Sequence, residues 1–252
     1  MTFWVPARDE KIEGRYQLEA VAEACVGSAD RQFFMGGVAF AAAIQALETD
    51  CDKPLLWATI QFSSHGMCGD EITIQIDPAR GGRTITQSSA TLTTHDRILQ
   101  KVMAALGARE GGFDQQFVSM PDVLPPMQCP EKPLDTFAQP GNLLDQFDRR
   151  IAVQDDDLGL EYLWVRPRFE TPRSAALLAL IADFFLGAHS CTQGGTSLDN
   201  TFRIHTAKPT EWVLNAVQLN GIRRGAVSGS ILQFAEDGTL LSSGSQTGLL
   251  PR

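Results

Sequence analysis

The sequence predicts an α+β fold built from two similar halves, in each of which an antiparallel sheet wraps around one central helix. Three observations predict it. Each half holds one segment that is apolar on nearly every side, and a helix of this kind has to be enclosed by the rest of the fold. In each half, four strand-like segments with turn residues between them follow that helix. The same order of elements recurs at an offset of about 140 residues, although the two halves share little sequence.

In the first half, Gly36 and Gly37 precede an apolar run from Val38 to Leu47 that only Gln45 interrupts. This run predicts an enclosed helix, and glycines at its start permit close packing of the backbone. Four segments with strand-like patterns follow, separated by Gly, Asp and Pro residues typical of turns: 55–62, 71–77, 84–92 and 98–106.

The second half repeats this plan. A strand-like segment, 160–170, comes before a helix whose start is marked by Pro172 or Ser174 and whose end is marked by Gly187. Four further segments are expected to form strands: 197–205, 211–219, 226–234 and 239–250.

The middle of the chain has a different composition. Six prolines lie between Met120 and Pro140, and proline fixes φ and removes a backbone donor. We therefore expect an irregular connector between Gly111 and Gln154. The predicted organisation is an N-terminal repeat, a proline-rich connector and a C-terminal repeat: 1–110, 111–157 and 158–252.

Charge and length exclude some classes of function. The chain has 252 residues and a formal net charge of −9, so binding of nucleic acid through general electrostatics is not expected, and any anion site has to be local. No apolar run approaches the roughly 20 residues that span a membrane, and the first residues do not resemble a signal peptide.

The five cysteines are odd in number, scattered and without a CxxC pair. This pattern favours reduced thiols in a cytoplasmic protein over a disulfide framework or a zinc site. The four histidines have no metal-ligand spacing either, so no metal is expected.

Asp183 is the most unusual residue of the second apolar segment. Eleven of the thirteen residues from Ala175 to Gly187 are apolar, and a carboxylate among them needs hydrogen bonds or a cavity. One interpretation is a core or interface aspartate that pairs with an arginine. The other is a general base at a cleft, with a pKa tuned by partial burial.

Two later strands carry further polar candidates. Alternation along a strand puts Ser197, Asp199 and Thr201 on one face, and Leu198, Asn200 and Phe202 on the other. Gln246 lies in a strand of small residues. Exposed polar alternation is the default interpretation of both patterns. Ser190 and His189 lack the GxSxG context of a hydrolase triad, and Gly36 and Gly37 lack the Lys-Ser/Thr of a phosphate loop.

The chain resembles the acyl-CoA thioesterase II family in several features taken together. These are the order of elements, the GG-apolar helix, the aspartate in the second helix, SLDN at a strand start and a glutamine in the last strand. The resemblance implies a double hotdog fold and a water bound and activated by Asp183, Ser197 and Gln246. The family usually has Asp-His at the strand start, followed by Trp-Phe-His-Arg. This chain has Asp199-Asn200, followed by Phe202-Arg203-Ile204-His205.

The implied activity is hydrolysis of acyl-CoA thioesters to the free acid and coenzyme A in lipid metabolism, with no cofactor other than the coenzyme A of the substrate. The N–H groups of Gly36 and Gly37 would hold the thioester oxygen, Phe184 and Phe185 would line the acyl cleft, and three arginines would contact the coenzyme A phosphates: Arg203, Arg223 and Arg224. The alternative is a non-catalytic protein of the same fold that binds acyl-CoA. A hotdog hydratase is disfavoured because only His189 is near the equivalent position.

An open sheet edge is expected in paired repeats of this kind. Because open edges need to be covered or paired, we expect a homodimer or a higher homo-oligomer.

Overall fold

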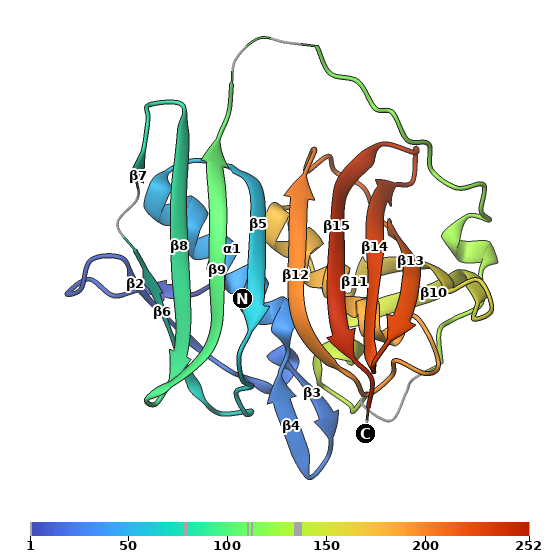
Figure 1. The fold of residues 1–252 in the computed structure, drawn as a ribbon, viewed down its shortest axis with the longest axis horizontal. Helices are drawn as coiled ribbons and strands as arrows, with labels where there is room; N and C mark the ends of the chain where they lie inside the picture. The colour runs from blue at the N-terminus through green and yellow to red at the C-terminus, as the bar shows by residue number, and fades with distance from the viewer. Residues whose placement is uncertain (1, 78–79, 110, 112, 134–137, 252) are drawn as a thin grey trace.

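The computed structural model describes residues 2–77, 80–109, 111, 113–133 and 138–251. Within them, thirteen strands form one continuous antiparallel sheet, and β3 and β4 pair separately as a hairpin. The two helices, α1 and α2, lie behind this sheet and contact each other (Figure 1). No helix among the described residues is long and apolar enough to cross a bilayer.

The N-terminal half contributes α1 and nine strands. Their bounds are β1 (Ala7–Arg8), β2 (Arg15–Glu19), β3 (Cys25–Ser28), β4 (Arg31–Phe34), α1 (Gly36–Cys51), β5 (Leu55–Phe62), β6 (Glu71–Ile76), β7 (Arg80–Gly81), β8 (Ile85–Thr94) and β9 (Arg97–Gly107).

The C-terminal half contributes α2 and six strands. Their bounds are β10 (Phe147–Asp155), β11 (Leu160–Pro167), α2 (Ala175–Ala182), β12 (Thr196–Ile204), β13 (Val213–Arg223), β14 (Ala226–Ala235) and β15 (Leu240–Leu249). Four short 3-10 helices complete the described structure: η1 (Ala22–Ala24), η2 (Pro126–Gln128), η3 (Leu143–Gln146) and η4 (Asp183–Gly187).

The strands of the two halves follow the same spatial order. The order is β2-β6-β8-β9-β5 in the N-terminal half and β11-β13-β14-β15-β12 in the C-terminal half. β5 and β12 pair with each other, which joins the two halves into one sheet at its centre (Figure 1). As a result, the residues that begin β12 lie next to the N-terminal half.

The core lies between the sheet and the helices. All residues of α1 from Gly37 to Ile44 are buried, and so is every residue of α2. Burial on all sides explains why neither helix has a polar face. Asp52 follows the last residue of α1 as its cap, and its positive φ of 48° gives the left-handed conformation common at helix ends.

The main predicted elements are present. β5 has the predicted bounds, and the other seven strands expected after the helices differ from them by a few residues at most. Ser174 is the cap of α2, because its hydroxyl accepts a hydrogen bond of 3.2 Å from the Leu177 N–H.

Two expectations differ from the structure. The second α-helix ends at Ala182, and Asp183 to Gly187 form a 3-10 turn, so Asp183 lies at the end of the helix and not inside it. The backbone expected to be irregular up to Gln154 becomes β10 from Phe147 onward. The last proline of the connector is Pro140, so nothing prevents the following residues from pairing with β11.

Candidate active site

The end of α2 meets the beginning of α1 at Asp183. A Cβ added at Gly37 would lie 2.7 Å from the Cβ of Asp183 and 2.9 Å from the backbone oxygen of Leu180. Glycine is therefore required for the two helix ends to approach this closely. The Gly37 N–H donates a hydrogen bond to the Asp183 carboxylate, so the positive end of the α1 dipole faces that carboxylate.

Gln246 joins Asp183 to Ser197. Its Nε2 donates to Oδ1 of Asp183 and to Oγ of Ser197, at 2.9 Å in each case. Gln246 is on β15 and Ser197 is on β12, the strand paired with β15. The three residues selected from the sequence thus form one hydrogen-bonded group at the point where the helix ends meet the sheet, and Asp183 has an amide as its partner instead of an arginine.

The faces predicted for β12 are correct from Asp199 to Phe202 but are exchanged for Ser197 and Leu198. Ser197 is opposite Gly248 and Asp199 is opposite Thr247, so Leu198 is an extra residue that forms a β-bulge. A bulge of one residue reverses the alternation of side chains beyond it. Ser197 and Asn200 therefore share the inner face, whereas strict alternation had placed them on opposite faces.

Asn200 is a further residue of this site, in addition to those predicted from the sequence. It is fully buried, and its Nδ2 donates to Oε1 of Gln246 at 3.1 Å. With its oxygen engaged in this way, the Gln246 amide can direct only its NH₂ group toward Asp183 and Ser197. Asn200 occupies the histidine position of the family pattern, but the bulge that turns it inward is not visible in the sequence.

Burial raises the pKa of Asp183 to about 7, because the charged carboxylate is removed from water. Hydrogen bonding by the Gln246 and Asn200 side chains and by the Gly37 N–H offsets part of this effect. Asp183 is 4% exposed. A carboxyl group with this pKa exchanges a proton readily near neutral pH, as a general base has to do.

A cavity of about 580 Å³ opens beside this group, and Asp183, Ser197 and Gly36 line it. Much of its wall is apolar, with contributions from the β3–β4 hairpin, from α1 and from the turn after α2. Lys132 from the connector and Gln100 from β9 add polar groups. The apolar lining residues are Val26, Phe33, Phe34, Met35, Phe62, Leu144, Leu163, Phe184 and Leu186.

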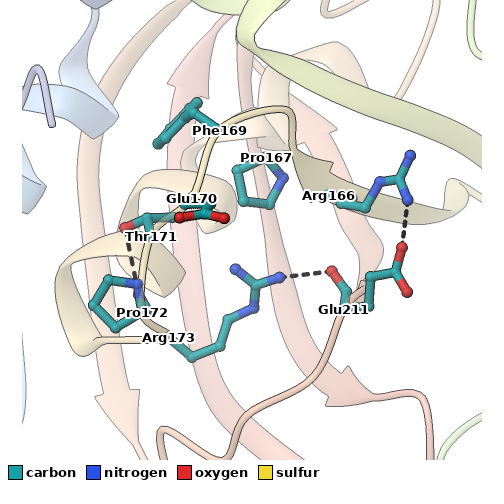
Figure 2. Close-up of a pocket in the computed structure, with 8 residues that line it drawn as sticks. All are labelled: Arg166, Pro167, Phe169, Glu170, Thr171, Pro172, Arg173 and Glu211. Carbon is teal, nitrogen blue, oxygen red and sulfur yellow. Dashed lines mark hydrogen bonds and ion pairs between the residues drawn. The ribbon is translucent and has the colours of Figure 1, made fainter. Parts of the chain in front are cut away.

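A second cavity, also of about 580 Å³, lies near the start of α2 (Figure 2). Two arginines of this cavity contact Glu211. Arg166 forms an ion pair with its carboxylate, and Arg173 donates a hydrogen bond of 2.6 Å to its backbone oxygen. Arg166 also pairs with Asp148. None of the predicted catalytic or substrate-binding residues lines this cavity, so the first cavity is the candidate active site.

The predicted substrate-binding residues fall into two groups. Gly36 and Phe184 line the cavity, and Gly37 contacts Asp183. Phe185 is fully buried against Gly229 on β14 and does not line the cavity.

The three predicted arginines lie on the surface. Arg203 is on β12, and Arg223 and Arg224 are at the turn between β13 and β14. None of them lines the cavity, whereas three other basic residues do: Arg31, Lys132 and Arg149. Lys132 forms an ion pair with the buried Glu161. Lys132 lies in the irregular connector, where no periodic pattern of the sequence could identify it as a residue of the cavity.

Two protein-family models match this chain. The model of the acyl-CoA thioesterase N-terminal domain matches residues 28–109, and that of the acyl-CoA thioesterase C-terminal domain matches residues 121–250. No curated protein matches the sequence.

Solved structures similar to this chain include a provisionally named thioesterase from Novosphingobium aromaticivorans DSM 12444, with 27% identity, a TM-score of 0.92 and full coverage of both chains. Two others are similar in fold alone. Acyl-CoA thioesterase II TesB2 from Mycobacterium marinum has 17% identity, a TM-score of 0.78 and coverage of 99% of this chain and 96% of its own. A hotdog-fold protein from Alicyclobacillus acidocaldarius has 18% identity, a TM-score of 0.84 and coverage of 99% and 97%. The fold is thus of the hotdog type, and the chain belongs to the acyl-CoA thioesterase family.

Proposed function

We propose that this protein hydrolyses acyl-CoA thioesters to the free acid and coenzyme A, using a water molecule activated by Asp183, Ser197 and Gln246. The observation that carries the proposal is the Gln246 amide, which donates to both Asp183 and Ser197 at the wall of the cavity. We also infer that the two halves are two hotdog repeats, because each has one buried helix and the same strand order.

Asp183 acts as the general base in this mechanism. Its ionised carboxylate accepts a proton from the water as the oxygen attacks the thioester carbonyl carbon. Ser197 Oγ accepts a hydrogen bond from Gln246, which leaves the hydroxyl proton of Ser197 available to orient the water. Asn200 acts through Gln246 and Asp183 and is a positioning residue.

The start of α1 stabilises the oxyanion. Gly36 lines the cavity, and its N–H has no hydrogen-bond partner among the described residues. An N–H at the positive end of a helix suits the negative charge that develops on the carbonyl oxygen. When the tetrahedral intermediate collapses, the carbon–sulfur bond breaks and the proton held by Asp183 passes to the leaving sulfur.

The apolar wall accommodates the acyl group. The basic residues that line the cavity, Arg31, Lys132 and Arg149, bind the phosphates of coenzyme A. Arg203, Arg223 and Arg224 stay candidates for that contact from outside the cavity. A homo-oligomer formed through the sheet edges, β1 and β10, and a role in cytoplasmic lipid metabolism are parts of the same proposal.

Release of coenzyme A from a panel of acyl-CoAs of different chain lengths tests the proposal. We expect turnover of at least one chain length, measured with a thiol reagent against a blank without enzyme. If the folded protein at high concentration turns over none of them but binds a non-hydrolysable acyl-CoA, the non-catalytic alternative replaces the proposal.

The rate is expected to depend on pH through Asp183. Because only the ionised carboxylate is a base, kcat/KM should rise about tenfold per pH unit below pH 7 and level off above it. The measurement is a pH profile from 5 to 9 at constant ionic strength, with the fold checked by circular dichroism at each pH. A rate that increases toward acid would contradict the role of Asp183.

A further inference from the structure

Gln100 is a buried polar residue of the cavity that the proposed mechanism does not use. It is on β9, is 2% exposed and lines the cavity. Its Oε1 is buried without a hydrogen-bond partner, and its Nε2 has none either among the residues that the structure describes. Because a buried amide normally finds partners within the fold, an unpartnered one aimed into a cavity points to a ligand group.

The position of Gln100 relative to Asp183 follows from the register of the sheet. Gln100 is directly opposite Phe62 on β5, so the two side chains are neighbours on the inner face. The Phe62 ring in turn lies against the start of α1, because a Cβ added at Gly36 would be 2.6 Å from it and 3.1 Å from Oδ2 of Asp183. Phe62 therefore separates Gln100 from Asp183.

This arrangement places an amide on the cavity wall one aromatic side chain away from Asp183, beside which the proposed mechanism puts the thioester. The surrounding wall includes apolar residues such as Phe34 and Met35. An unsubstituted alkyl chain would leave both ends of the Gln100 amide unpaired. A hydroxyl group both donates and accepts, so it can pair with either end of an amide.

We propose that Gln100 binds a hydroxyl group on the acyl chain beyond its third carbon, and that the preferred substrates are hydroxyacyl-CoAs. This inference rests on the proposed function, since it assigns the substrate class of the same site. The pantetheine arm of coenzyme A offers similar hydrogen-bonding groups. However, the arm has to lead the nucleotide out to solvent, whereas Gln100 is almost completely enclosed.

Binding of non-hydrolysable thioether analogues, measured by calorimetry, tests this without requiring turnover. The panel is an unsubstituted acyl chain and chains of equal length with the hydroxyl at the third, fourth, fifth or sixth carbon. We expect the wild-type protein to bind one of the chains hydroxylated beyond the third carbon about tenfold more tightly than the unsubstituted chain. The preference should disappear or reverse in Gln100→Leu, which keeps the size but removes the amide.

Gln61→Leu is the matched control. Gln61 is exposed on the neighbouring strand β5, and its replacement should leave the preference unchanged. Equal preferences in the wild type and Gln100→Leu would overturn the proposal. So would an equal loss of affinity for all chains in Gln100→Leu, which would assign the amide to the pantetheine arm. Selective binding without turnover of the matching thioesters would support the Gln100 site and contradict the proposed hydrolysis.

Discussion

Asp183→Asn is expected to lower kcat for thioester hydrolysis by roughly 10²- to 10⁴-fold, the range that a positioned general base contributes. Asparagine has nearly the same shape, and its oxygen can still accept the hydrogen bond from Gln246, so the geometry around Gln246 is retained. What is lost is the ability to accept the proton of the water. Steady-state kinetics on the best substrate of the acyl-CoA panel measures the effect.

Asp157→Asn is the matched control, because Asp157 is exposed in the turn between β10 and β11. It should keep the wild-type kcat. An unchanged kcat in Asp183→Asn would remove this carboxylate from the mechanism.

The stability of the Asp183→Asn variant separates loss of chemistry from loss of fold. Between about pH 4 and pH 7 the folded protein retains a proton on Asp183 that the unfolded chain releases, so wild-type stability falls as pH rises through this window. The raised pKa corresponds to a cost of about 4 kcal/mol once Asp183 is ionised. The asparagine variant lacks this cost, so its thermal midpoint should be at or above that of the wild type at pH 8. A lower midpoint would mean that the fall in kcat reflects damage to the fold.

Gly37→Ala is expected to reduce both activity and stability. The new methyl group would meet the Cβ of Asp183 at 2.7 Å and the backbone oxygen of Leu180 at 2.9 Å. Neither atom can rotate away, so the start of α1 has to move from the end of α2. Overpacking of this kind costs about 1–3 kcal/mol of unfolding free energy. A shift of catalytic groups by about 1 Å lowers kcat by roughly 10²-fold.

Gly36→Ala provides the comparison for this effect. Its methyl group would meet the ring of Phe62, the end of a side chain that can rotate, so the loss of stability should be smaller. The measurements are the free energy of unfolding in urea and kcat for each variant, both compared with the wild type. If Gly37→Ala is as stable and as active as the wild type, the close approach of the two helix ends has no role in catalysis.

The start of α1 lies close to both negative charges of the proposed reaction, that of the Asp183 carboxylate and that of the oxyanion. The Gly37 N–H favours the ionised carboxylate, and the adjacent Gly36 lies at the cavity wall where we propose that the oxyanion forms. A proton moving from the water to Asp183 reduces the negative charge at this carboxylate as negative charge appears on the substrate oxygen. The helix end can therefore stabilise charge on either side of the proton transfer.

Much of the fold was predictable because burial leaves a periodic pattern. The two apolar helices and the strands that follow them repeat in each half, and their positions agree with the structure within a few residues. β1 to β4 were not predicted, because these strands are short and lie in a polar part of the sequence. The cap at Ser174 was one of two candidate start signals, and the structure selects it.

The candidate site was only partly predictable. Asp183, Ser197 and Gln246 were selected together through the family resemblance, and the structure brings them into one hydrogen-bonded group. Asn200 was missed because the bulge at Leu198, which puts Ser197 and Asn200 on the same face, is not visible in the sequence. Gln100 was missed because one glutamine in an apolar strand has the same appearance in the sequence whether or not a cavity lies beside it.

The sequence was sufficient to predict both apolar helices and the strands that follow them, the plan shared by the two halves, and a carboxylate that interrupts the second apolar segment. These are local properties, since they follow from side-chain polarity and spacing along the chain. The folded structure was needed to establish that Asp183 faces Gln246 instead of an arginine, that Ser197 and Asn200 share a face, and that Gln100 has no hydrogen-bond partner among the described residues. Each of these depends on contacts between elements far apart in the chain, and the register of those contacts is set by the packing of the whole sheet against the helices.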